Sequence, residues 1–353
     1  MIRIFNFIIY LNLVVSVLFL GLTYYRSEII YEGQLHVKYV KYYILFFASI
    51  IFWTILLGGR KVNKFIAIVC FFAVTAFLYG AEIVIYYVSI NRDVTNRLEA
   101  AQALGVKFDE RTKFNVCADL VDQGFDAFPC FQPTNLIDSD KAIFPLGGAS
   151  HKTTVGGNEN GKYMIYESDR FGFNNPDDAW DSKSLEWFLT GDSMIQGMAV
   201  QPGEDIGGRI RTLTNQSVIN VGMSGNGPLI ELAVINEYAV CRKPNKVLWF
   251  YFEGNDLAGD LWKEKTESFL MKYLNNPTFT QNLKSRQNEI DIMLKRYVQE
   301  QMSCESKRFL TNLLLLPNVR EILIHNHNYI TIDPLFKKIL GKARDQVESW
   351  GGN

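Results

Sequence analysis

Three long stretches without a charged residue occupy the first ninety residues, and they constrain the fold more than any other feature. The stretches are residues 4–25, 42–59 and 65–81, and the third continues past Glu82 as far as residue 88. A helix needs about 20 apolar residues to cross the hydrocarbon core of a bilayer. We therefore expect three transmembrane helices. The alternative for the first is a cleaved signal peptide that starts with Arg3, but no small-x-small cleavage site follows it.

The charges of the two connecting loops predict how these helices are oriented. Residues 60–64 carry three positive charges within five positions, whereas residues 26–41 spread three over a longer stretch that also holds two acidic residues. Short loops rich in positive charge stay in the cytoplasm. We therefore expect a multi-pass protein of the plasma or inner membrane, with its N-terminus inside and the residues after the third helix outside.

Glu82 is the one acidic residue within these apolar stretches. Carboxylates inside a membrane are often functional. Since Glu82 falls near the expected outer end of the third helix, we expect it to reach the lipid headgroups instead.

The rest of the chain has the composition of an ordinary soluble domain. The net charge is −1, from 36 basic and 37 acidic residues, and gives no reason to expect nucleic acid as a partner. No cluster of cysteine and histidine has the spacing of metal ligands, so we expect neither a metal nor a cofactor. We divide the chain into a membrane region (1–91), a connector with a cysteine-containing loop (92–142) and an α/β domain (143–353).

Two cysteines of the connector predict a disulfide bond. Cys117 and Cys130 are thirteen residues apart in a loop-rich segment, which suits a disulfide in an oxidising compartment. The alternative is two buried, unpaired thiols.

Strand and helix patterns alternate in the C-terminal half. Short apolar runs at residues 185–190, 218–221 and 247–252 predict buried strands, and helical patterns separate them. This order predicts a parallel sheet with helices on both faces. Before it, the Asn160-Gly161 pair predicts a β-hairpin, and helices are expected at 94–104, 281–301, 305–315 and 334–350.

Each of the three strands is followed by residues that carry chemistry. Gly191-Asp192-Ser193 follows the first, a glycine-rich turn over residues 222–227 follows the second, and Gly254-Asn255-Asp256 follows the third. The carboxyl ends of parallel strands meet at one edge of a sheet. A serine hydroxyl, a glycine N–H and an amide side chain at that edge are the parts of an ester-cleaving site with an oxyanion hole.

Each of these residues also has a purely structural interpretation. Ser193 could be only a helix N-cap. Gly225 could serve only a tight turn, with Gly222 or Gly227 providing the N–H group instead. Asn255 could simply close a turn with its side chain.

The three blocks together resemble the SGNH (GDSL-like) hydrolases. The resemblance covers about residues 169–260, and the lead-in at residues 169–175 is similar to that of membrane-tethered bacterial members, several of which add or remove O-acyl groups on exported polysaccharides. It implies a flavodoxin-like doubly wound parallel sheet. It also implies Ser193 as nucleophile and oxyanion N–H, with Gly225 and Asn255 as the other oxyanion donors.

One part of the family pattern is missing. The family takes its general base from an Asp-x-x-His block near the C-terminus, and none of His36, His151, His325 and His327 lies in such a block. We expect structural or solvent-exposed roles for them. The last predicted helix ends at Gly351-Gly352, where a doubly wound sheet would continue with a strand. We therefore expect a domain that is incomplete at its C-terminus, with the base beyond residue 353.

Three functions are compatible with these features. The first is a membrane-anchored esterase or deacylase that acts outside the membrane on an acylated glycan. The second is an O-acyltransferase that modifies exported polysaccharide and receives its acyl group from a membrane partner. The third is a catalytically inactive, carbohydrate-binding homologue, which the missing histidine favours.

Overall fold

The computed structural model describes residues 2–30, 33, 36–137, 139, 141–198, 200–276, 278–319 and 333–353. These residues form two compact units. The first contains the described residues of the range 1–88 together with 310–319, and the second contains those of 89–309 and 333–353.

The first unit is built from long apolar helices. Helix α1 (Ile2–Tyr24) continues into a π-helical segment, η1 (Tyr25–Ile30), and packs against α2 (His36–Leu57); the first part of α3 (Lys61–Ala103) follows. Within the described residues, three helices are long and apolar enough to cross a membrane. The predicted membrane-length helices are therefore confirmed. The hydroxyls of Ser16 in α1 and Ser49 in α2 form a hydrogen bond of 2.8 Å between the two helices.

Lys64 lies inside this unit, although the sequence placed it in a charged loop. Its Nζ donates to Asn6 Oδ1 at 2.8 Å and to the carbonyl oxygen of Leu57 at 2.7 Å, and the residue is only 6% exposed. The first of these bonds puts the start of α1 and the turn between α2 and α3 at the same end of the unit. Arg60 and Lys61 remain exposed there.

Glu82 has a different environment from the predicted one. It is 3% exposed, and its carboxylate accepts hydrogen bonds from the backbone N–H groups of Asn318 and Val319, at 3.1 and 2.8 Å, and from Asn318 Nδ2 at 2.7 Å. Residues 317–319 form a helical turn, so Glu82 satisfies N–H groups that have no partner within that turn. The expectation that it reaches the headgroups is wrong, because a distant segment covers it.

The second unit contains two small sheets. In the first, β1 (Ala127–Pro129) pairs in parallel with β2 (Thr153–Val155), and β2 pairs antiparallel with β3 (Ile165–Glu167). Strands β2 and β3 form the predicted hairpin, and Gly161 in its loop has a φ of +101°. In the second sheet, β4 (Trp187–Thr190) lies between β5 (Val218–Asn220) and β6 (Lys246–Trp249), and all pairings are parallel.

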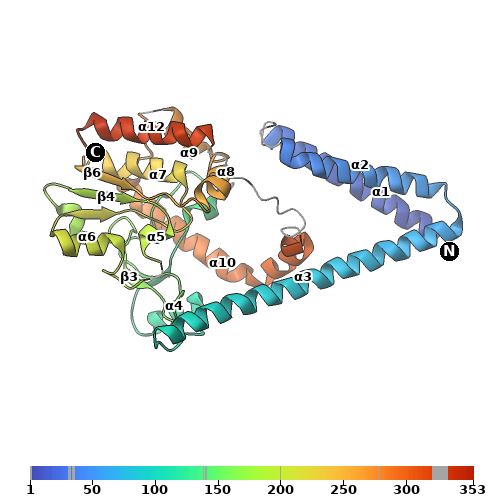
Figure 1. Cartoon of the computed structure of the whole chain (residues 1–353), viewed down its shortest axis with the longest axis horizontal. Coiled ribbons are helices and arrows are strands. Elements are labelled where there is room, and N and C mark those ends of the chain that lie inside the picture. Colours follow the sequence, from blue (N-terminus) through green and yellow to red (C-terminus); the bar gives the residue numbers. More distant parts are fainter. Residues whose placement is uncertain are drawn as a thin grey trace. The chain divides into compact units, whose positions relative to one another are not determined.

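Helices cover both faces of the second sheet (Figure 1). Alternate strand residues point to opposite faces. Phe188, Ile219 and Val247 pack into the larger hydrophobic core, which also contains side chains of α7 (Pro228–Val234) and α12 (Pro334–Ser349). Leu189, Val218 and Leu248 pack instead with residues of α5 (Ser193–Gln196) and α6 (Ile206–Thr214). The mixed α/β class is thus confirmed, while the flavodoxin-like topology remains a prediction.

Several helices differ from their predicted bounds. Helix α3 is continuous over 43 residues and includes the helix expected at 94–104, and α10 (Gln287–Leu315) joins two helices that were expected to be separate. Helix α7 continues as the π-helical η4 (Ile235–Ala239). The remaining elements are α4 (Lys113–Asp122), η2 (Pro133–Leu136), η3 (Asp177–Asp181), η5 (Asp256–Asp260), α8 (Leu261–Glu264), α9 (Ser268–Asn275) and η6 (Leu283–Arg286).

Asp169 organises the loop that precedes β4. Its carboxylate is fully buried and accepts four hydrogen bonds of 2.7–3.0 Å, from the backbone N–H groups of Phe171 and Phe173 and from the side chains of Asn175 and Trp180. Asn175 in turn exchanges two hydrogen bonds, both of 2.8 Å, with the backbone of Asn220 in β5. This loop is therefore fixed to the sheet.

Candidate functional site

The three strand ends lie at one edge of the second sheet. The N–H of Phe250, after β6, donates to the carbonyl oxygen of Thr190 at 2.9 Å, and the N–H of Met223, after β5, donates to that of Gly191 at 3.2 Å. Strand β4, which leads to Ser193, is the central strand. Parallel pairing therefore brings the segments after all three strands together.

Ser193 is the first residue of α5, and its hydroxyl makes no hydrogen bond within the described residues. The N-cap of this helix is Asp192, whose carboxylate accepts from the N–H of Met194 at 2.9 Å. The N-cap interpretation of Ser193 is therefore wrong. Within the described residues, neither the hydroxyl nor the N–H of Ser193 has a hydrogen-bond partner, and the residue is half-buried. An unengaged N–H at a helix N-terminus is a suitable donor to a developing oxyanion.

The glycine-rich turn offers a second unengaged N–H group. Gly222 N–H donates to Asn220 Oδ1 at 3.0 Å, and Gly227 N–H donates to Glu264 Oε1 at 2.7 Å. Gly225 N–H has no acceptor among the described residues. Its φ is +77°, and an added Cβ would lie 2.9 Å from Thr134 Oγ1. Of the three glycines considered, Gly225 is thus the one whose amide remains available.

Ser193 lines a pocket of about 680 Å³ within the second unit, whose lining includes both polar and apolar side chains. Ser224, the neighbour of Gly225, lines the same pocket. Gln196 connects the two segments, because its Oε1 accepts from the N–H of Ser224 at 2.8 Å. Gln132 Nε2 donates to the Ser224 hydroxyl at 2.9 Å. The other lining residues are Arg97, Lys113, Gly157, Asn158, Glu159, Tyr163, Met194, Gly197, Met198 and Val200.

Two cations line this pocket. Arg97 is paired with Asp93 at 3.0 Å and lies 3.9 Å from Glu159. Lys113, at the start of α4, is half-buried and has no hydrogen-bond or ion-pair partner within the described residues. An ammonium group and a hydroxyl that line one pocket, both without a partner among the described residues, suit an oxygen-rich ligand.

Asn255 is not among the residues that line the Ser193 pocket. It precedes η5 as its N-cap residue, but its side chain makes no capping bond, and its Oδ1 is buried without a partner. The turn here is closed by Asp256, whose Oδ2 accepts from the N–H of Phe252 at 2.7 Å. The turn-closing interpretation of Asn255 is therefore wrong, and its predicted role as an oxyanion donor stays a prediction.

Three buried carboxyl groups lie in the helical segments that follow β5 and β6: Glu231 in α7, Asp256 in η5 and Glu264 in α8. Burial raises the pKa of Asp256 to about 7, against the effect of its bond to the Phe252 N–H group. Burial also raises the pKa of Glu231 well above its usual range, and the negative charges of Asp256, Glu264 and Asp192 add to this shift. Glu264 accepts from three N–H groups at the start of α7, at 2.7–3.4 Å, and burial raises its pKa to about 8.

Cys117 and Cys130 are free thiols, so the predicted disulfide is wrong. Helix α4 buries Cys117 in a small apolar cluster with Val116 and Val155. Cys130 follows β1, and its sulfur accepts from Gln196 Nε2 at 3.1 Å. The two thiols therefore have different surroundings. Burial raises the pKa of Cys117 to about 11 and also raises that of Cys130. Raised pKa values disfavour the thiolate form, which is the nucleophile, so neither thiol is activated.

The histidines do not complete the site. His36 Nδ1 lies 2.7 Å from Glu28 Oε1 in the first unit. His151 is exposed and lines a different pocket, of about 720 Å³, together with Arg211 and Asp205. His325 and His327 lie outside the described residues. No histidine is among the residues described as lining the Ser193 pocket.

Sequence reasoning missed four residues around Ser193. Ser224, Gln132 and Lys113 line the pocket from the glycine-rich turn, the loop after β1 and the start of α4. Gln196 of α5 is buried outside the pocket lining and accepts the hydrogen bond from the N–H of Ser224. Only Gln196 carried a usable signal, because it lies one helical turn after Ser193.

No family model, curated protein or solved structure matches this chain. A function therefore has to follow from the chemistry of the pocket.

Proposed function

We propose that this protein is a membrane-anchored serine esterase or deacylase of the SGNH type, which removes O-acyl groups from a glycan outside the membrane. The observation that carries the proposal is the arrangement at the end of β4. Within the described residues, the Ser193 hydroxyl and N–H and the Gly225 N–H have no hydrogen-bond partner, and Ser193 and Ser224 line one pocket.

The proposed reaction follows the usual two steps of acyl transfer. Ser193 Oγ attacks the acyl carbon, and the N–H groups of Ser193 and Gly225 stabilise the oxyanion. The sugar oxygen then leaves as a hydroxyl group and takes up the proton given up by the Ser193 hydroxyl. Water next attacks the acyl-Ser193 ester, which releases the carboxylic acid and returns a proton to Ser193 Oγ. Each oxyanion donor of this kind typically lowers the barrier by about 3 kcal/mol. Asn255 would add a third donor if its side chain turns toward Ser193.

The proposed location follows from the first unit. The exposed Arg60 and Lys61 keep the turn between α2 and α3 in the cytoplasm. If all three apolar helices cross the bilayer, the second unit lies on the opposite side of the plasma or inner membrane from that turn. An acylated, exported polysaccharide is a substrate available on that side.

A serine-directed fluorophosphonate tests the proposal on the full chain in detergent. We expect a covalent adduct on Ser193, located by mass spectrometry of peptides, and slow hydrolysis of 4-nitrophenyl acetate. Ser193→Ala should abolish both. Ser224→Ala is the matched control, because it removes a hydroxyl from the same pocket and should leave the adduct in place. Acetyl transfer to an added oligosaccharide in preference to water would identify a transferase.

A carbohydrate-binding protein without catalytic activity is the second candidate. It is favoured by the lack of a histidine among the described lining residues. In that case neither an adduct nor turnover would appear, although an oligosaccharide would bind to the pocket. Binding that weakens on substitution of Lys113 by Ala, without any adduct on Ser193, would establish this candidate instead.

A further inference from the structure

Some of the polar side chains that line the Ser193 pocket already have partners in the surrounding backbone. Asn158 Nδ2 donates to the carbonyl oxygen of Asp109 at 3.0 Å. The Tyr163 hydroxyl donates to the carbonyl oxygen of Arg111 at 2.6 Å. These two side chains therefore use their donors to hold the wall of the pocket in place.

The charged side chains of the lining are unequally balanced. Among the described lining residues, Glu159 is the only acid. Arg97 has one nitrogen 3.0 Å from an Asp93 oxygen and another 3.9 Å from a Glu159 oxygen, so its charge is compensated. Lys113 has no hydrogen-bond or ion-pair partner in the described part of the chain. Its ammonium group is thus the unbalanced positive charge of this pocket.

The position of Lys113 in α4 gives no local reason for a cation. It is the first residue of this ten-residue helix, where a positive charge opposes the helix macrodipole. Thr112 caps the helix, because its Oγ1 accepts from the N–H of Asn115 at 3.2 Å. Val116 packs with Val155 of β2 in a small apolar cluster, which fixes this end of α4. An anion bound beside Lys113 would remove the unfavourable charge.

We propose that the acylated glycan is acidic, and that Lys113 binds its carboxylate or phosphodiester group while Ser193 attacks the ester. This inference rests on the proposed esterase function for the nature of the ligand. A single unbalanced ammonium group matches a group with one negative charge, which carboxylates and phosphodiesters both carry. A hydrogen bond between charged partners is stronger than one between neutral groups. Esters that lie near an acidic group are therefore preferred to neutral ones.

Two acetate esters of similar shape and different charge test this preference on the full chain in detergent. 4-Acetoxybenzoate is an anion, whereas 4-acetoxybenzamide is neutral. Lys113→Met should lower kcat/KM for the benzoate by about tenfold and leave that for the benzamide within about twofold. Lys113→Arg should retain the activity toward the benzoate. A larger loss in Lys113→Met with 4-acetoxyphenyl methyl phosphate than with the benzoate would identify a phosphodiester as the natural group.

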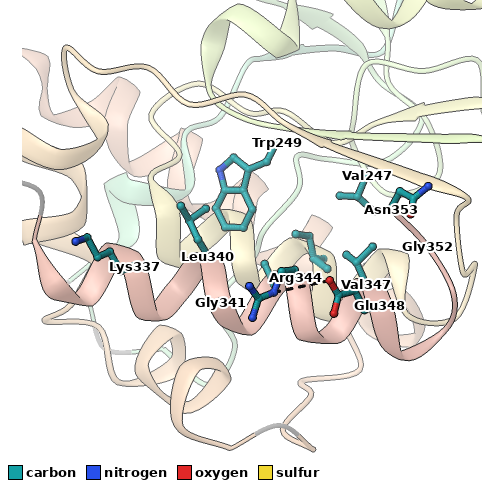
Figure 2. Close-up of a pocket in the computed structure, with 12 residues that line it drawn as sticks. Val247, Trp249, Lys337, Leu340, Gly341, Arg344, Val347, Glu348, Gly352 and Asn353 are labelled. Atoms are coloured by element: carbon teal, nitrogen blue, oxygen red, sulfur yellow. Dashed lines mark ion pairs between the residues drawn. The ribbon is translucent and has the colours of Figure 1, made fainter.

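Lys337 provides the matched control. This exposed lysine lines the groove between β6 and α12, and Figure 2 shows it at one end of that groove. Lys337→Met removes the same charge from a different pocket and should change neither rate. The wild-type chain gives a further measurement. Raising the NaCl concentration from about 50 to about 500 mM should lower the rate for the benzoate relative to the benzamide, because salt screens a partly exposed ion pair.

Analogues with an amide in place of the ester separate this proposal from the esterase function. Titrations of 4-acetamidobenzoate and 4-acetamidobenzamide, followed by ligand-observed NMR, give the two Kd values. If no ester is hydrolysed and Ser193 forms no adduct, but Lys113→Met weakens binding of the benzoate analogue about tenfold, the esterase function fails and the acidic-ligand site stands. Absence of binding, equal binding to wild type and Lys113→Met, or a benzoate preference that salt does not reduce would overturn the site.

Discussion

Buried carboxylates fix the loops on which the candidate site depends. Asp169 has four N–H partners in the loop before β4, and Glu237 accepts four bonds from the segment of residues 273–283. Glu264 holds three N–H groups where α7 begins. A buried charge is costly unless it is fully bonded. Substitution of any of these acids should therefore lower the stability of the second unit, although none of them is among the residues that line the Ser193 pocket.

Asp169→Asn should destabilise the second unit. Four N–H groups now donate to the two oxygens of the Asp169 carboxylate. In the variant, the asparagine amide replaces one of these oxygens by an NH₂ group, which cannot accept, so at least one buried N–H loses its acceptor. We expect a loss of about 2–4 kcal/mol in the free energy of unfolding. Urea titration followed by tryptophan fluorescence measures it. Asp177→Asn, at a half-exposed position, should cost clearly less. Equal effects of the two substitutions would show that burial of Asp169 does not matter.

Asp256 should make stability depend on pH. Its pKa of about 7 in the folded protein is above the usual value near 4 because the group is buried. Between these two values the folded chain holds a proton that the unfolded chain has released. The contribution of Asp256 to stability therefore falls as the pH rises from about 4 to 7 and then levels off. Asp256→Asn should flatten this slope in urea titrations, and an unchanged slope would contradict the assignment.

At the scale of secondary structure, local patterns predicted the strands but not all helix ends. The strands β4 and β5 lie within the predicted runs, and β6 begins one residue before its run and ends three residues before the predicted end, because buried parallel strands are short and apolar. The change from apolar to polar residues near Asn91 was taken as a helix boundary. It marks the end of the apolar span only, since residues 89–95 contain neither glycine nor proline to stop α3.

The candidate site was predictable only in part for a similar reason. The edge at which the strand ends meet follows from parallel pairing, so Ser193 and the glycine-rich turn could be placed together. Lys113 and Gln132 reach the pocket through long-range packing of α4 and the loop after β1, which no local pattern encodes. The predicted disulfide failed likewise, because spacing in sequence does not show that α4 buries Cys117.

Gly222 tests how closely α5 packs on the glycine-rich turn. A Cβ at this position would lie 2.7 Å from Ile195 Cγ2 and 2.8 Å from the backbone N of Gln196. Gly222→Ala must therefore displace α5, at a cost of about 1–3 kcal/mol. We expect lower stability and slower labelling of Ser193 by fluorophosphonate. Gly341→Ala, which meets no atom, is the control. Normal labelling in Gly222→Ala would show that the position of α5 does not govern Ser193.

At the scale of the whole molecule, the two units divide the surface into an apolar and a polar part. Large apolar side chains are exposed along α1, α2 and the first part of α3, as expected for helices that face lipid. The second unit buries most of its apolar side chains in one core that joins the sheet to α7, α9 and α12. Membrane association and the candidate chemistry therefore belong to different parts of the chain.

Cys241 provides a test of the proposed orientation without any introduced residue. It is an exposed, free thiol in the second unit, whereas Cys117 is buried and Cys70 lies in an apolar membrane-length helix. A maleimide that cannot cross membranes should therefore label Cys241 in right-side-out vesicles before they are permeabilised. Mass spectrometry of peptides should locate a label on Cys241, and Cys241→Ser should remove that label. If labelling appears only after permeabilisation, the second unit faces the cytoplasm, and an exported polysaccharide could not be its substrate.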